Sequence, residues 1–374
     1  MEKIHPLLNQ EKQSMAKRYE KENRILSLAG AIISFLTLLA FYYSGLSAKL
    51  ASPSISESII KTFLFYAVAF QAVLAIFGTP LHFYSSYIHE HKWNFSNHTV
   101  KSWFLEQLKS FLVSLMIFLI VLSLLFRIMA VYPQNWWLIA GLAMALVSIV
   151  FSTLLPVVIL PVFNKYTRIE NKELTSVLEK TLSKAGLRSS GFFKEDMSRQ
   201  TKKENAFFVG LGKTRRVVLG DNLMEKMSVP EIESIIAHEV GHYKHKHIWK
   251  LIGLGTLQQL IIFYVLNMLM KMLFPQFLQS TRWNLTLFPF FVILLGAISG
   301  FFFKPLGNTL SRKFEKQADS YALESIKHKT EFMTALAGLA DRNLSNAYPD
   351  WWVKLLYYSH PPIGERLSKA EQFQ

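Results

Sequence analysis

The segment FLVSLMIFLIVLSLLFRIM, residues 111–129, has a single charged side chain, Arg127, in nineteen positions. A helix of about 20 apolar residues is long enough to cross the hydrocarbon core of a bilayer. The same test selects six stretches, which are residues 25–46, 63–81, 111–129, 136–163, 251–273 and 285–303. The sequence therefore predicts an all-α polytopic membrane protein with six transmembrane helices. We expect the fourth, which carries Pro156 and Pro161, to kink or to leave the membrane before Asn164.

The overall composition agrees with this class. Of 374 residues, 51% are hydrophobic and only 18% are charged, which is typical of a membrane protein rather than of a soluble one. The chain has no cysteine, so disulfides and Cys-rich structural zinc sites are excluded. We attribute the net charge of +15 to loops on the cytoplasmic side of the membrane and not to a nucleic-acid partner.

Positive charge also predicts the orientation in the membrane. Residues 1–24, 80–106, 164–247 and 304–374 hold 34 of the 41 Lys and Arg residues, and six spans place all four segments on one side. The positive-inside rule then places the N-terminus, the C-terminus and the large loop in the cytoplasm.

Two large polar regions remain between and after the spans, and we expect them to join into one small cytoplasmic α+β region. The predicted division is a cytoplasmic N-terminal segment 1–24, helices one to four in 25–163, a zinc-protease region in 164–250, helices five and six in 251–303, and a C-terminal protease region in 304–374.

The chemistry is predicted within residues 228–242. Ser228 and Glu231 form a capping-box pattern that starts a helix, and this helix continues through His238-Glu239-Val240-Gly241-His242. Histidines four residues apart on a helix lie on one face and can bind one Zn²⁺ ion. Glu239 can take a proton from the zinc-activated water that attacks a peptide carbonyl, and can then pass it to the departing amine.

A third ligand is sought by elimination. No Asp or Glu occurs from Val240 to Phe314, and the first acidic residue is Glu315, which follows spans five and six on the same predicted side of the membrane. We interpret Glu315 as the third zinc ligand. Asp319 lies one helical turn further and is predicted to accept a hydrogen bond from a ligand imidazole. We interpret His245 and His247 as polar residues where the helix meets the membrane, not as a second metal site.

With these residues in place, the chain resembles the type I CAAX prenyl protease family of integral-membrane zinc metalloproteases. The resemblance runs roughly from residue 25 to 367. Its most specific motifs are HEVGHYK at 238–244, SRKFEKQAD at 311–319 and YSHPPIGERL at 358–367.

The resemblance implies the same zinc ligands and the same base, with Asp319 in support. It adds His360, which would stabilise the oxyanion, and Arg366, which would support the site. Residues 205–209 resemble the family's edge strand, on which an extended substrate pairs with the backbone of Asn205 and Ala206. The family fold places its helices around a chamber and often has seven spans, so the first span is expected to be missing here.

The predicted function is a membrane-embedded zinc metalloendopeptidase with one Zn²⁺ ion. Its expected substrates are peptides or proteins, for example prenylated C-terminal tails. The alternatives are a quality-control protease of the heat-shock type and a catalytically silent membrane chaperone. A transporter is suggested only by the number of spans, and few charged residues lie inside them to form an ion pathway.

Overall fold

The structure, a computed structural model, describes residues 4–52, 59–210, 215–327 and 329–373. Among these residues, six helices are long and apolar enough to cross a membrane. They contain α1 (Gln10–Tyr43), α3 (Ile59–Phe83), α5 (Val100–Val131), α6 (Trp136–Leu154), α11 (His247–Leu273) and α13 (Phe288–Ala297). The six predicted spans and the all-α membrane class are confirmed.

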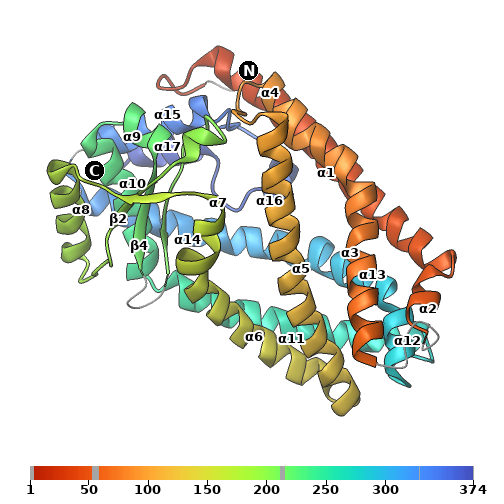
Figure 1. Ribbon diagram of the computed structural model, residues 1–374. Helices are drawn as coiled ribbons and strands as arrows, with labels where there is room; N and C mark the ends of the chain where they lie inside the picture. Colours follow the sequence, from red (N-terminus) through yellow and green to blue (C-terminus); the bar gives the residue numbers. More distant parts are fainter. Residues whose placement is uncertain (1–3, 53–58, 211–214, 328, 374) are drawn as a thin grey trace.

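The long helices do not form one close-packed bundle. In Figure 1 they diverge, with α1 and α3 along one side and α6 and α11 along another. Only 11–28% of the apolar window of each span is buried inside the protein. Most residues in these windows are therefore not buried by the protein, as expected for helices that surround a chamber in a membrane.

Several spans continue beyond their regular α-helix. α3 leads through the π-helix η2 (Tyr84–His89) into α4 (Glu90–Lys92), and α13 leads through η6 (Ile298–Phe303) into α14 (Lys304–Ser325). α6 ends at Leu154, where the π-helical turn η3 (Leu155–Ile159) and the short α7 (Leu160–Phe163) follow. The break falls in the proline-containing part of the span, as the sequence predicts.

One apolar core holds the spans together. Trp136 is fully buried there, and its indole Nε1 donates a 2.8 Å hydrogen bond to Asn267 Oδ1 on α11. The short helices α2 (Leu46–Leu50) and α12 (Thr281–Thr286) close the same end of the molecule (Figure 1). Other large buried members of this core are Phe41, Tyr66, Phe70, Phe126, Leu266, Phe288 and Phe291.

The first polar region contains a four-stranded sheet in the order β1-β2-β4-β3. Its strands are β1 (Tyr166–Arg168), β2 (Phe192–Glu195), β3 (Ala206–Val209) and β4 (Arg216–Gly220). β2 and β4 are parallel, whereas the β1–β2 and β3–β4 pairs are antiparallel. The strand expected at residues 205–209 is therefore present as β3, which pairs with β4. Residues 211–214, between these two strands, lie outside the described residues.

The rest of the two polar regions is largely helical, and some of these helices pack on the sheet. They are α8 (Lys172–Lys184), the 3-10 turn η4 (Met197–Arg199), α9 (Asp221–Lys226), α10 (Val229–Lys244), α15 (Lys329–Arg342), α16 (Trp351–Tyr357) and α17 (Ile363–Glu371). α10 contacts α8, α14 and α15, so the two polar regions meet although the hairpin of α11 and α13 separates them in sequence.

The N-terminal part of α1 also contacts this region. The Gln13 side chain is 1% exposed, donates to Asp341 Oδ1 over 3.0 Å and accepts from the Ala347 amide over 3.0 Å. Glu20, two turns further, accepts hydrogen bonds from Asn346 Nδ2 and from the Tyr358 hydroxyl. Residues expected to form a separate N-terminal segment thus contact α15 and the loops before and after α16.

Candidate metal centre

The metal-binding motif lies on α10, which begins as predicted. The capping box is formed, with the Ser228 amide donating to Glu231 Oε2 over 2.9 Å. The buried positions Ile232, Ile236 and Val240 then follow the helical period and face α8 and the sheet. This anchoring directs His238 and His242 to the opposite side of α10, where their ring Nε2 atoms are 3.2 Å apart.

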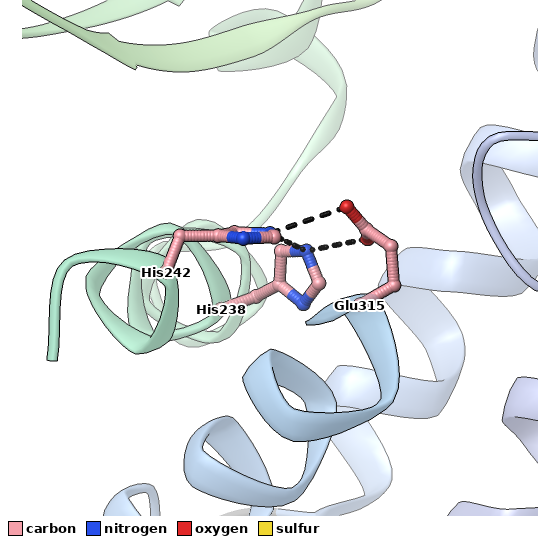
Figure 2. Close-up of side chains that lie close together, drawn as sticks. All are labelled: His238, His242 and Glu315. Atoms are coloured by element: carbon pink, nitrogen blue, oxygen red, sulfur yellow. Dashed lines mark hydrogen bonds and ion pairs between the residues drawn. The ribbon is translucent and has the colours of Figure 1, made fainter. Parts of the chain in front are cut away.

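Glu315 on α14 completes the group. Its Oε2 lies 3.1 Å from His238 Nε2, and its Oε1 lies 3.3 Å from His242 Nε2. Figure 2 shows the three side chains converging from two helices. The structure therefore brings together the two residues of the motif and the carboxylate 73 positions after His242.

The geometry fits one metal ion. Zinc binds imidazole nitrogen and carboxylate oxygen at about 2.0–2.1 Å, so two ligand atoms of a tetrahedral site lie roughly 3.4 Å apart. The three observed separations are close to this value. Glu315 Oε2 is also buried, with His238 Nε2 as its neighbour at 3.1 Å, and a buried carboxylate is costly unless positive charge or a hydrogen-bond donor compensates it. His238, His242 and Glu315 can hold an ion.

Asp319 occupies the predicted supporting position. Its Oδ1 lies 2.8 Å from His238 Nδ1, so in the neutral, metal-binding form of the ring Nδ1 carries the proton and Nε2 has the lone pair directed at the site. Arg366 donates two hydrogen bonds to the same carboxylate, from Nε to Oδ2 over 3.0 Å and from Nη2 to Oδ1 over 2.6 Å. This bidentate pair fixes Asp319, and Asp319 in turn fixes the ring of His238.

Among the pKa values that the electrostatics of the site shift, those of His238 and Glu239 bear most directly on proton transfer. Burial alone would lower the pKa of His238, but the hydrogen-bonded carboxylates of Asp319 and Glu315 outweigh it and raise the pKa to about 9. Burial raises the pKa of Glu239, against the opposing effect of the neighbouring imidazoles. A carboxyl group with a raised pKa is better able both to accept and to return a proton near neutral pH.

A cavity of about 410 Å³ adjoins these residues. Glu239, His360 and Arg366 contribute to its lining. His360 Nε2 lies 3.3 Å from Glu315 Oε1, and its side chain is 61% exposed. It therefore stands at the mouth of the site, where it can reach a molecule bound in the cavity.

The start of the edge strand β3 lines the same cavity through Asn205 and Ala206. The backbone groups of these two predicted substrate-binding residues point in different directions. The Asn205 carbonyl accepts a hydrogen bond from the Gly220 amide over 2.9 Å, so its peptide groups face β4. Because these groups alternate along a strand, the amide and carbonyl of Ala206 face the free edge. Phe208 confirms the alternation, since its backbone hydrogen-bonds Glu239. Ala206 is the better placed of the two to pair with a peptide.

His247 contacts the site, and this contact was not predicted from the sequence. His247 is 1% exposed, and its Nδ1 lies 3.0 Å from His242 Nδ1. His247 is the first residue of a candidate span, which agrees with its predicted place where the helix meets the membrane, and its contact with His242 was not predicted. An unbroken helix would place it on another face, but Lys246 has φ 57° and ψ 34° and separates α10 from α11. No local pattern in the sequence marks a lysine for this left-handed conformation.

Two family models match consecutive parts of the chain. The family described as "Peptidase family M48" matches residues 168–374. A second, described as "CAAX prenyl protease N-terminal, five membrane helices", matches residues 2–165. Four of the candidate spans found among the described residues lie in that second stretch.

Individual relatives match over most of the chain. It is 30% identical over 369 residues to the "Uncharacterized metalloprotease YhfN" of Bacillus subtilis, covering 96% of this chain and 85% of that protein. It is 29% identical to CAAX prenyl protease 1 of Saccharomyces cerevisiae, over 78% of this chain and 68% of that one. The crystal structure of S. mikatae Ste24p aligns with a TM-score of 0.85 at 25% identity, covering 98% and 90% of the two chains.

Proposed function

We propose that His238, His242 and Glu315 hold one zinc ion. The proposal starts from the family, because this chain belongs to peptidase family M48 and is a membrane metalloprotease. The observation that carries the proposal is the convergence of three ligand atoms, all within 4.8 Å of one another, beside Glu239 and a cavity. When bound, zinc supplies Lewis acidity to the attacking water and to the scissile carbonyl.

Glu239 is the general base. It follows a metal ligand in sequence, lines the cavity and has a raised pKa because it is buried. It takes the proton of the attacking water and returns it to the departing amine. The backbone of Phe208 holds its carboxylate, so the base is fixed with respect to the edge strand on which the substrate lies.

His360 and Arg366 have different roles. His360 stands on the open side of the site and donates a hydrogen bond to the carbonyl oxygen as negative charge develops there. Arg366 is buried against Asp319 and positions His238 through that carboxylate. His360 therefore contacts substrate, whereas Arg366 acts through other residues.

The substrate is a peptide in extended conformation that adds a strand to β3. Ala206 offers an amide and a carbonyl to it, whereas the next outward position upstream is occupied. There the Asn343 side chain accepts from the Glu204 amide over 2.9 Å and donates to the Glu204 carbonyl over 3.0 Å. Main-chain pairing accepts many sequences, and the names of several relatives favour prenylated C-terminal tails as a substrate class.

The protease region faces the cytoplasm in this proposal, because the Lys and Arg bias places both termini and the large loop on that side. It combines residues 164–250 and 304–374 with the N-terminal segment 1–24, which contacts α15 through Asn9 and Gln13.

The test compares the wild type with Glu239→Gln. Both are purified in detergent, assayed for bound zinc, and given a prenylated and an unprenylated peptide with and without a chelator. We expect equal zinc content, cleavage by the wild type only, and loss of that cleavage with chelator. Zinc-containing but inactive wild-type protein would favour the silent-chaperone alternative, and undiminished cleavage by Glu239→Gln would exclude this base. Preference for the unprenylated peptide would favour the quality-control alternative.

A further inference from the structure

The two candidate imidazole ligands are held in unlike ways. His238 is bonded through Nδ1 to the carboxylate of Asp319. His242 is bonded through Nδ1 to a second imidazole, that of His247, over 3.0 Å. His247 in turn is bonded through Nε2 to Gln317 Oε1 over 2.8 Å. The Nδ1 atom of His242 is thus bonded to a chain of uncharged groups, His247 and Gln317, whereas the Nδ1 atom of His238 is bonded to a carboxylate.

The direction of this chain follows from its last member. The Gln317 carbonyl oxygen can only accept a hydrogen bond, so His247 Nε2 carries a proton. In a neutral imidazole the other nitrogen, Nδ1, is then an acceptor. It accepts from His242 Nδ1, which must therefore be protonated, and the lone pair of His242 is left on Nε2. That atom is the one facing Glu315.

The surroundings hold His247 in place. Its ring is 1% exposed and stacks on Phe314, with ring centroids 4.4 Å apart and an angle of 14° between the planes. Phe314 and Gln317 lie on α14, the helix that also carries Glu315. The left-handed Lys246 turns the chain so that the first residue of α11 reaches back to α10.

We propose that His247 is a positioning residue, which fixes the metal-binding tautomer and ring orientation of His242 through the hydrogen-bond chain ending at Gln317. This inference rests on the proposed metal site. It also links the start of a transmembrane helix to that site, because α11 begins at His247.

Two substitutions separate hydrogen bonding from packing. In His247→Phe the ring can still stack on Phe314, but it accepts no hydrogen bond. In His247→Gln the stacking is lost, but the amide oxygen can accept from His242 Nδ1. Partners behind a metal ligand typically contribute about 10–100-fold to metal affinity. We therefore expect His247→Phe to weaken zinc binding by about 10–100-fold and His247→Gln to stay within about threefold of the wild type.

Matched controls use the neighbouring residues. His245 stacks on His247 at a centroid distance of 5.5 Å, and among the described residues it has neither a side-chain hydrogen bond nor a ring contact with His242, so His245→Phe should leave zinc affinity unchanged. Gln317→Leu removes the acceptor of the chain and should weaken binding, whereas Gln317→Glu keeps an acceptor and should preserve it. These two variants keep the test decisive even if His247→Phe folds poorly.

The measurement is zinc affinity of the full-length protein in detergent, by competition with a chromophoric chelator, together with the visible spectrum of the Co²⁺-substituted protein. We expect His247→Phe to change both, and His247→Gln neither. Wild-type affinity in His247→Phe, or equal losses in the Phe and Gln variants, would overturn the proposal. A His242→Ala variant tests the metal site separately from the role of His247, because undiminished zinc binding in that variant would refute the metal site itself.

Discussion

Gly241 sets the distance between the helix that carries both histidines and the helix that carries Glu315. A Cβ atom at this position would lie 2.9 Å from Ala318 Cα, 3.0 Å from Ala318 O and 3.2 Å from Tyr321 Cβ. Carbon atoms in contact are ordinarily about 3.5–4.0 Å apart. Because two of the three neighbours are backbone atoms, Gly241→Ala must separate α10 and α14 by roughly 0.5–1 Å.

The separation falls one helical turn from Glu315 and directly beside Asp319. Metal–ligand distances tolerate only about 0.2 Å, so this shift would break the convergence of the three ligands. We expect zinc affinity to fall at least about tenfold, and kcat/KM to fall about 100-fold because a displacement of about 1 Å can cost that much. Overpacking should also lower the free energy of unfolding by about 1–3 kcal/mol.

The assays are chelator competition for zinc affinity, peptide cleavage for kcat/KM, and thermal unfolding in detergent. The matched control is Gly255→Ala on α11, where no atom lies within 4 Å of the added Cβ. That variant should match the wild type in zinc affinity and kcat/KM and should unfold at an equal or higher temperature, because alanine favours a helix more than glycine does. If Gly241→Ala kept zinc affinity and kcat/KM within about twofold of the wild type, or if both variants lost them equally, the close helix contact would not position the metal ligands.

Four other outcomes follow from the same geometry. Asp319→Asn should weaken zinc binding by about 10–100-fold in chelator competition, because the carboxylate that orients His238 is lost; unchanged affinity would contradict this role. Zinc affinity should rise with pH by up to about tenfold per unit until the pH approaches the His238 pKa of about 9, since the bound ion must displace that proton; a flat titration from neutral pH upward would contradict the shift. Ala206→Pro should raise KM up to about tenfold without loss of zinc, because the edge strand loses one amide donor worth about 1 kcal/mol; an unchanged KM would place the substrate elsewhere. Ser228→Ala should cost about 1 kcal/mol of stability in thermal unfolding, with Ser228→Asp close to the wild type; equal loss in both would argue against the cap.

The parts of the fold that follow from local pattern were predictable from the sequence. Runs of apolar residues locate the six spans, because a bilayer imposes their length and composition. The helix that carries the motif begins at Ser228, because capping chemistry is local. Glu315 was found by elimination, because it is the first carboxylate in the sequence after Glu239.

What escaped prediction depends on contacts between distant segments. The pairing of Asp319 with Arg366 joins α14 to α17, and sequence spacing does not encode which helices meet. The outward direction of Ala206 depends on the register of β3 against β4, which local alternation leaves open by one residue. The position of His247 depends on one left-handed residue, Lys246, which the sequence does not distinguish from a helical lysine.

The central claim is that two helices bring three side chains to one zinc ion. An anomalous-difference map recorded at the zinc absorption edge, from crystals of the purified protein, tests it most directly. We expect one strong peak, about 2.0–2.2 Å from His238 Nε2, His242 Nε2 and a carboxylate oxygen of Glu315. A map of zinc-supplied crystals with no peak there, or with its strongest peak at His245 and His247, would contradict it.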